Sequence, residues 1–574
     1  MRNGNYILIL HTHLPWVLHH GQWPHGEDWI TETTAESYIP LLNMCHRLLK
    51  DGISPNITIG LSPVLCEQLA HRDFPSIFEK YCQNKIELAH KDIEKFKRFD
   101  SHPHMIYIAG QWAKWYEDRL SDFKEKYNSS VVGAFAELQK KGALEIITCA
   151  ATHGYLPLLP TENAINMQIH LAVENYRKYF GRSPRGIWLP ECAYRPSYEW
   201  QSMLPIFPFH LKKLRPGIEQ FLAHEGIEYF VSDEANLKRS SLLGFFNNRS
   251  KTSFKAATPD EQKYFDEVKT PLKVYNVSSS EKTGYGTAAV FTRHHDIAMQ
   301  VWSGTIGYPG EPDYLDFHKK EADSLLRYWS VTDSKLDMQY KKFYYPDNID
   351  RKIDMQSNDF IHHIENSVND FKHKSAGLNA SLCTPFDTEL FGHWWFEGPK
   401  FIEAVMRGLH DSPFVSVTTA TEYLLQNPPY EVINLPESSW GENNNHDVWS
   451  NPENIWTWEF LYNDENRLTM FFDKYPLDSL NRLTLRIMKQ AYRELLLEQS
   501  SDWQFLIHTQ SAKDYAEMRL SNHHSDYNGL ISLAIKIQEG GELSEPDGKF
   551  LVDIENRDSL FEEIDLHWWR ELDF

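Results

Sequence analysis

The chain has 574 residues, with 58 Lys plus Arg against 80 Asp plus Glu and a formal net charge of −22. This excess of negative charge repels phosphate backbones and anionic lipid surfaces, so we expect neither nucleic acid nor a membrane among its partners. The length exceeds that of one ordinary core, and a large catalytic domain with an accessory domain is expected.

Aromatic residues make up 14% of the chain and include 18 Trp. Their flat rings pack well against the C–H faces of sugars, so a neutral polysaccharide fits both the charge and the composition. The six cysteines are scattered without a Cys-x-x-Cys pair, and no disulfide scaffold or zinc site is predicted. The apolar stretch at residues 6–10 predicts a strand rather than a signal peptide, and no run approaches the roughly 20 residues that span a bilayer. We therefore expect a cytoplasmic protein.

Short apolar runs bounded by turn residues alternate with helical patterns, which is typical of a parallel sheet. Several runs are continuously apolar, as expected for strands buried on both faces. The expected strands are 6–10, 56–59, 144–149, 186–189, 227–231, 288–291, 380–384 and 414–417. Polar and aromatic residues follow them directly, which is the layout of a barrel-type α/β enzyme.

Three segments depart from this alternation. Residues 72–130 are highly charged with helical spacing and predict a helical insertion. Residues 236–273 are rich in Lys, Ser, Asn and Phe with little periodicity, and predict a long lid loop. Beyond Asn427-Pro-Pro429 the pattern becomes helical, especially over 480–499 and 512–537. We expect a catalytic domain over 1–427 and an all-helical domain over 428–574 that contributes to the substrate groove.

Two carboxylates, Glu191 and Asp387, each stand where an apolar strand gives way to an aromatic-rich loop. Cleaving a glycosidic bond requires one carboxylic acid to protonate the leaving oxygen and one carboxylate to attack or stabilise the sugar carbon. The pair therefore predicts sugar chemistry. The alternative is that each carboxylate caps a helix or joins a surface ion pair.

Taken together, several segments resemble glycoside hydrolase family 57, and within it the 1,4-α-glucan branching enzymes, over nearly the whole chain. They are His11–Pro15, Trp23–Trp29, Thr148–Tyr155, Trp188–Tyr194, Gln300–Ser303, Gly307–Gly310, Thr384–Gly398 and Ser500–Ile507. The resemblance implies a distorted (β/α)7 barrel and a retaining mechanism with Glu191 as nucleophile and Asp387 as general acid/base. It also implies an α-glucan such as amylose or glycogen as partner, with no cofactor and no metal.

The resemblance supplies candidate substrate-binding residues, and a structural role is the alternative for each of them. Two histidines are expected to hydrogen-bond sugar hydroxyls, an arginine to steady the charge of the nucleophile, and four tryptophans to line the glucan groove. The candidates are His11, His153, Arg293, His393, Trp29, Trp302, Trp440 and Trp449. Of the neighbouring pair His11 and His13, only His11 is expected to point into the barrel mouth.

The acceptor that resolves the glycosyl-enzyme intermediate decides the reaction. A branching enzyme presents the 6-hydroxyl of a glucan, a hydrolase admits water, and a 4-α-glucanotransferase presents a 4-hydroxyl. Branching is the leading hypothesis, with Phe245, Phe246, Phe254 and Tyr264 of the lid as candidates for the acceptor side. A non-catalytic glucan-binding protein is a further alternative. So is a metal-dependent deacetylase, which the His-x-His spacing raises.

Overall fold

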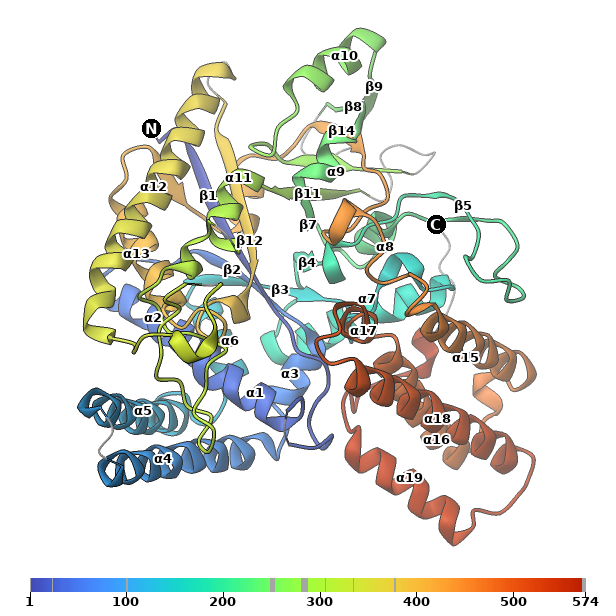
Figure 1. The fold of residues 1–574 in the computed structure, drawn as a ribbon. Helices are drawn as coiled ribbons and strands as arrows, with labels where there is room; N and C mark the ends of the chain where they lie inside the picture. The colour runs from blue at the N-terminus through green and yellow to red at the C-terminus, as the bar shows by residue number, and fades with distance from the viewer. Residues whose placement is uncertain are drawn as a thin grey trace.

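The computed structural model describes residues 2–22, 24–99, 102–247, 253–279, 287–304, 306–333, 335–375 and 378–569 (Figure 1). Within them, seven parallel strands form a closed barrel. Its strands, in order, are β1 (Gly4–Thr12), β2 (Ile57–Leu61), β3 (Leu144–Cys149), β4 (Gly186–Trp188), β7 (Tyr229–Asp233), β11 (Ala288–Arg293) and β12 (Ala380–Asp387). Pairing of β12 with both β1 and β11 closes the barrel. The expected (β/α)7 fold class and its seven barrel strands are confirmed.

Further strands extend the barrel wall. The expected strand at 414–417 is β13 (Val415–Val417), which pairs with β1. On the other side, β10 (Tyr275–Val277) runs antiparallel to β11 and is followed in the sheet by β14 (Glu431–Asn434), β8 (Ser241–Phe246) and β9 (Phe254–Ala256). Thus β14 lies beyond the expected domain boundary at 427 but belongs to the barrel's sheet. A separate ladder joins β5 (Tyr198–Trp200) to β6 (Lys213–Arg215).

Helices cover the outside of the barrel (Figure 1). They are α1 (Glu27–Thr33), α2 (Ile39–Lys50), α3 (Pro63–Leu69), α6 (Val131–Lys140), α7 (Glu162–Phe180), α8 (Ile218–His224), α9 (Glu234–Lys238), α11 (His295–Trp302), α12 (Ile349–Lys374), α13 (Gly398–Asp411) and α14 (Ala420–Gln426). In the predicted helical segment 72–130, α4 (Phe74–Arg98) and α5 (Pro103–Ser121) lie side by side at the edge of the molecule.

The expected long loop at 236–273 contains regular structure, so that expectation is wrong. The apolar run of β8 pairs antiparallel with β14 and with β9, and α10 (Pro259–Val268) packs against β8. A capping box formed by Thr258 and Glu261 starts α10, and Phe265 buries its apolar face. Residues 248–252 of this segment lie outside the described part of the chain.

The C-terminal part is a group of packed helices beside the barrel (Figure 1). They are α15 (Ile455–Lys474), α16 (Arg482–Glu498), α17 (Asp502–Thr509), α18 (Lys513–Gln538) and α19 (Glu545–Arg557). The helices expected over 480–499 and 512–537 are confirmed as α16 and α18. Among the described helices, none is both long enough and apolar enough to cross a membrane.

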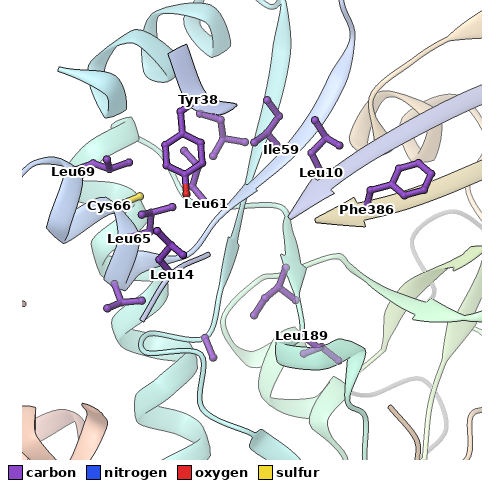
Figure 2. Close-up of a cluster of buried hydrophobic side chains, with 14 of the residues drawn as sticks. Leu10, Leu14, Tyr38, Ile59, Leu61, Leu65, Cys66, Leu69, Leu189 and Phe386 are labelled. Atoms are coloured by element: carbon purple, nitrogen blue, oxygen red, sulfur yellow. The ribbon is translucent and has the colours of Figure 1, made fainter. Parts of the chain in front are cut away.

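Alternate side chains of β1 serve two different cores, because successive residues of a strand point to opposite faces. Leu10 is fully buried in the layer between the barrel and its helices, close to Ile59 and Phe386 of neighbouring strands (Figure 2). Ile7 and Ile9 instead join a cluster contributed by six barrel strands, inside the barrel. His11 continues this inward series, so the strand that anchors the core also delivers a polar residue to the barrel mouth.

Candidate active site

Glu191 lies directly after β4, in a short turn over Pro190–Cys192. Its φ of 60° places it in the left-handed region, which is uncommon for a residue other than glycine and costs on the order of 1–3 kcal/mol. Both carboxylate oxygens accept hydrogen bonds from the chain beyond residue 428. Trp440 Nε1 donates to Oε2 at 2.9 Å, and Ser501 Oγ donates to Oε1 at 3.1 Å.

Asp387 is the last residue of β12 and pairs in register with His11 of β1. Phe386 and Phe391, which flank it along the chain, are almost completely buried. Burial raises the pKa of Asp387 to about 8; the nearby Glu389 adds to this increase, and Arg293 opposes it. This buried setting therefore favours the neutral form of Asp387.

Burial also raises the pKa of Glu191, to about 7. The hydrogen bonds from Trp440 and Ser501 stabilise the carboxylate and limit this increase, whereas the charges of Asp502 and Asp387 add to it. Because the two carboxyl groups repel each other when both are ionised, they titrate as an interacting pair. Burial thus raises the pKa of both carboxyl groups, and a raised pKa lets a carboxyl group keep its proton near neutral pH, as a general acid must.

His11 and His153 form a pair of buried histidines near Glu191. His11 stacks on Trp188 with ring centroids 4.6 Å apart, and its Nε2 lies 3.0 Å from Nε2 of His153. Burial lowers the pKa of both imidazoles well below the usual value, so both rings are neutral near pH 7. In the structure, Nε2 of His11 is engaged by His153 and its Nδ1 is buried. Neither nitrogen is therefore free for the expected contact with a sugar hydroxyl.

The expectation that only His11 of the pair points into the barrel mouth is wrong. His13 stacks on His153 with ring centroids 3.9 Å apart, on the same side as His11, because residues two apart in a strand share one face. His13 Nε2 lies 2.9 Å from Asp502 Oδ2. Although burial opposes it, the interaction with His13 lowers the pKa of Asp502 to about 2.

Arg293 ends β11 and forms an ion pair with Asp233 of β7. Its positive charge lowers the pKa of Asp387 and so acts on the expected acid/base residue. Trp302 is half-buried between Phe386, which precedes Asp387, and Trp440, which bonds to Glu191. Its ring centroid lies 6.1 Å from that of Phe386 and 6.3 Å from that of Trp440.

Three other candidates pack against residues other than the two carboxylates. Trp29 is half-buried on α1 beside His25. His393 lies in a buried ion-pair network, with its Nδ1 2.9 Å from Oε2 of Glu36. Trp449 is only 1% exposed and stacks on Tyr155, so its ring is covered rather than presented to a groove.

The lid aromatics do not gather at the site. β8 pairs antiparallel with β14 and runs from Ser241, opposite Asn434, to Phe246, whose amide bonds to Tyr430. This register carries Phe245, Phe246 and the paired Phe254 away from the end of β14 that continues to Trp440. Tyr264 is 65% exposed on α10.

Two overlapping sets of side chains have the residue types and spacing of metal ligands. They are His11 with Cys149 and His153, and His13 with His153 and Asp502. In this structure the members of each set hydrogen-bond to one another, as in the pairs His11–His153 and His13–Asp502. An enzyme without metal stays our prediction.

Ser501 was not among the residues predicted from the sequence, although it touches Glu191. Its segment, Ser500–Ile507, is one of those that carry the family resemblance, and this was the available signal. A serine before a helix normally indicates a cap. Only the packing of α17 against the barrel mouth shows that this hydroxyl reaches a carboxylate of another domain.

A closed parallel barrel with two interacting carboxyl groups at its strand ends defines an α/β-barrel protein with a paired-carboxyl site. The chain belongs to glycosyl hydrolase family 57, whose model matches residues 7–436. A second model, described as the C-terminal region of 1,4-alpha-glucan branching enzymes, matches residues 461–569. The family resemblance expected from the sequence is confirmed.

Individual relatives are similar over almost the whole chain. A 1,4-alpha-glucan branching enzyme of Thermococcus kodakarensis is 36% identical over 562 residues, which is 98% of this chain and 78% of the relative. The crystal structure of a GH57-type branching enzyme from Pyrococcus horikoshii has a TM-score of 0.86 and 35% identity, covering 100% of this chain and 97% of the other. The alpha-amylase AmyC from Thermotoga maritima has a TM-score of 0.79 and 28% identity, with 100% of both chains covered.

Proposed function

We propose that the protein is a 1,4-α-glucan branching enzyme, which cleaves an α-1,4 bond and forms an α-1,6 branch. The observation that carries the proposal is that the likeness to branching enzymes extends through the C-terminal helices, and that this part of the chain contacts Glu191. We further propose the organisation expected from the sequence, with a catalytic part over 1–427 and a mainly helical part over 428–574, which adds β14 to the barrel's sheet and completes the site.

In this proposal, Asp387 in its protonated form donates its proton to the glycosidic oxygen while Glu191 attacks the anomeric carbon. The C–O bond to the leaving chain breaks, and a covalent glycosyl-enzyme ester forms on Glu191. The 6-hydroxyl of an acceptor glucan then attacks the same carbon. Asp387 takes the proton of that hydroxyl, the ester bond breaks, and both carboxyl groups return to their starting states.

Hydrolysis is the second candidate function, because the AmyC alpha-amylase is similar over the full length of both chains. Water in place of the 6-hydroxyl would give hydrolysis at the same two carboxyl groups, and a 4-hydroxyl would give 4-α-glucanotransfer. These three reactions share the first half of the mechanism and differ in the acceptor.

Amylose incubation distinguishes them. Before debranching, the product is expected to show no gain in reducing ends. Digestion with a debranching enzyme, followed by chain-length analysis, is then expected to release a new population of short chains. Reducing ends that increase without new branch points would overturn the proposal in favour of hydrolysis. Redistributed linear chains without branches would favour 4-α-glucanotransfer, and unchanged amylose would favour a non-catalytic glucan-binding protein.

The proposal includes a glycogen-like polymer as product and a cytoplasmic location. The six cysteines are buried and unpaired, which supports a reducing compartment. The net charge of −22 supports a neutral glucan rather than nucleic acid as the partner.

A further inference from the structure

A continuous series of close contacts leads from β1 to Glu191, and its last member comes from the start of α17. His11 Nε2 lies 3.0 Å from His153 Nε2, and His153 Nδ1 lies 2.8 Å from Ser501 Oγ. Ser501 Oγ in turn lies 3.1 Å from Oε1 of Glu191. His11, His153 and Ser501 are all buried, so solvent does not compete for these hydrogen bonds.

When Glu191 is ionised, the number of protons available fixes the donor and the acceptor of every hydrogen bond in the series His11–His153–Ser501–Glu191. A carboxylate can only accept, so the single hydroxyl proton of Ser501 must point to Glu191. Ser501 then accepts from Nδ1–H of His153. Since a neutral imidazole has one N–H, Nε2 of His153 must accept, and His11 must donate from its own Nε2. The Nδ1 atom of His11 is left without a proton.

The opposite direction requires a protonated Glu191 that donates to Ser501. Each hydrogen bond in the series then runs the other way: Ser501 donates to Nδ1 of His153, and His153 donates from Nε2 to Nε2 of His11. The remaining N–H of His11 is therefore on its Nδ1. That atom is buried and has no hydrogen-bond partner among the residues that the structure describes. A buried donor without an acceptor is unfavourable, whereas a hydroxyl that donates to a carboxylate forms a charge-assisted bond. This series of hydrogen bonds therefore favours the ionised form of Glu191.

The ring planes in this chain are fixed by neighbours. His13 stacks on His153 at 3.9 Å and is itself held by Asp502, at 2.9 Å, and by Ser62 Oγ, also at 2.9 Å. The backbone amide of Ser501 donates to the carbonyl oxygen of His153 at 3.0 Å. Two adjacent residues of the helical part, Ser501 and Asp502, therefore fix the His153 imidazole. Ser501 is its hydrogen-bond partner, and Asp502 holds His13, which stacks on it.

We infer that Ser501 is a positioning residue for the nucleophile Glu191. It keeps the Glu191 carboxylate ionised and oriented, because the hydrogen bonds from His11 through His153 to Ser501 all donate toward Glu191. The inference rests on the proposed function, in which Glu191 attacks the anomeric carbon. Trp440 holds the other oxygen, so the two donors fix the plane of the carboxylate from both sides. Both donors belong to the chain beyond residue 428.

Ser501→Ala tests the inference by removing the hydroxyl. We expect kcat for amylose branching to fall about 10- to 100-fold with KM changed less than about threefold, because the bond acts on the nucleophile and not on glucan binding. Ser501→Thr retains a hydroxyl and is expected to restore most of kcat. The control is Ser511→Ala, at an exposed serine just after α17, which is expected to behave as wild type.

Neutron diffraction on deuterated wild-type crystals provides a readout that does not depend on turnover. We expect deuterium on Nδ1 of His153 and on Nε2 of His11, and none on Nδ1 of His11. Deuterium on Nε2 of His153 would overturn the inference, as would Ser501→Ala with unchanged kcat. If that variant does not fold, the neutron map and Ser501→Thr decide. A wild-type protein that fails to branch amylose would instead contradict the proposed function, while the proton positions would still be measured.

Discussion

Trp440 donates its indole N–H to Oε2 of Glu191 at 2.9 Å, and its backbone N–H donates to the carbonyl oxygen of the same glutamate at 3.0 Å. One residue therefore fixes both the strained turn and the carboxylate that it carries. The segment that holds Trp440 follows β14, so the outer strands of the sheet connect directly to the proposed nucleophile.

Replacing Trp440 by Phe removes the donor and keeps an aromatic ring. Because this hydrogen bond lowers the pKa of Glu191, that pKa should rise and the acid limb of the kcat/KM profile should move to higher pH. We expect kcat/KM at pH 7 to fall about 10- to 100-fold. Trp449→Phe is the matched control, since Trp449 is buried against Tyr155 and should leave the limb in place. An unmoved acid limb in Trp440→Phe would contradict the assigned role of this bond.

The wild-type pH profile should be bell-shaped. Glu191 must be ionised to attack, so activity should fall as the pH drops through about 7. Asp387 must be protonated to donate, so activity should also fall as the pH rises through about 8. Initial rates of amylose branching between pH 5 and 10 would test this. A profile that is flat from pH 6 to 9 would show that these two groups do not control the reaction.

Two neighbours of Asp387 should move the alkaline limb in opposite directions. Arg293 lowers the pKa of Asp387, so Arg293→Gln should shift this limb to higher pH. Glu389 raises the same pKa, and Glu389→Gln should therefore shift the limb to lower pH. Arg293→Lys keeps the charge and is the control for lost packing. Shifts of the same sign in both variants would show that the limb reports another group.

Asp387→Asn should lower the branching rate by about 10²–10⁴-fold, the usual contribution of a general acid. The loss should be much smaller on an α-maltosyl substrate with a nitrophenolate leaving group, because that group departs without a proton. Asp266→Asn, at an exposed position in α10, serves as the control. An equal loss on both substrates would assign Asp387 to binding or folding rather than to proton donation.

The core beneath the site can be tested separately from its chemistry. Leu10 is fully buried directly beside His11 in β1, and Leu10→Ala should lower the free energy of unfolding by about 2–5 kcal/mol. Leu214→Ala, at a position 60% exposed, should change it by less than about 0.5 kcal/mol. Denaturant unfolding monitored by tryptophan fluorescence would measure both. Equal effects of the two substitutions would contradict the packing seen here.

The barrel could be predicted because its strands are buried on both faces and therefore appear as continuous apolar runs, as at 144–149 and 380–384. The positions of Glu191 and Asp387 at strand ends could be predicted because an apolar run precedes each of them, and their catalytic roles stay predictions. The short strand β8 was missed although its apolar run is present in the sequence. Its neighbours are rich in polar residues, and the partner β14 lies almost 200 residues away.

The exposure of individual tryptophans and the hydrogen-bond partners of individual side chains were harder to predict from the sequence. Trp440 and Trp449 look alike in the sequence, but one bonds to Glu191 and the other is buried against Tyr155. That difference depends on how the loop after β14 folds back over the barrel. Ser501 carries even less information, since one hydroxyl group has no pattern that identifies its acceptor.

The site is built from segments far apart in the sequence, and these are synthesised at different times. The seven barrel strands are all complete once residue 387 has been added, and N-terminal domains generally fold first during synthesis. At that stage Glu191 lacks both of its donors, which arrive with residues 440 and 501. A chain that forms the barrel first therefore lacks these two donors, and we expect its reactivity toward glucans to reach the full level only when the last quarter of the protein has docked.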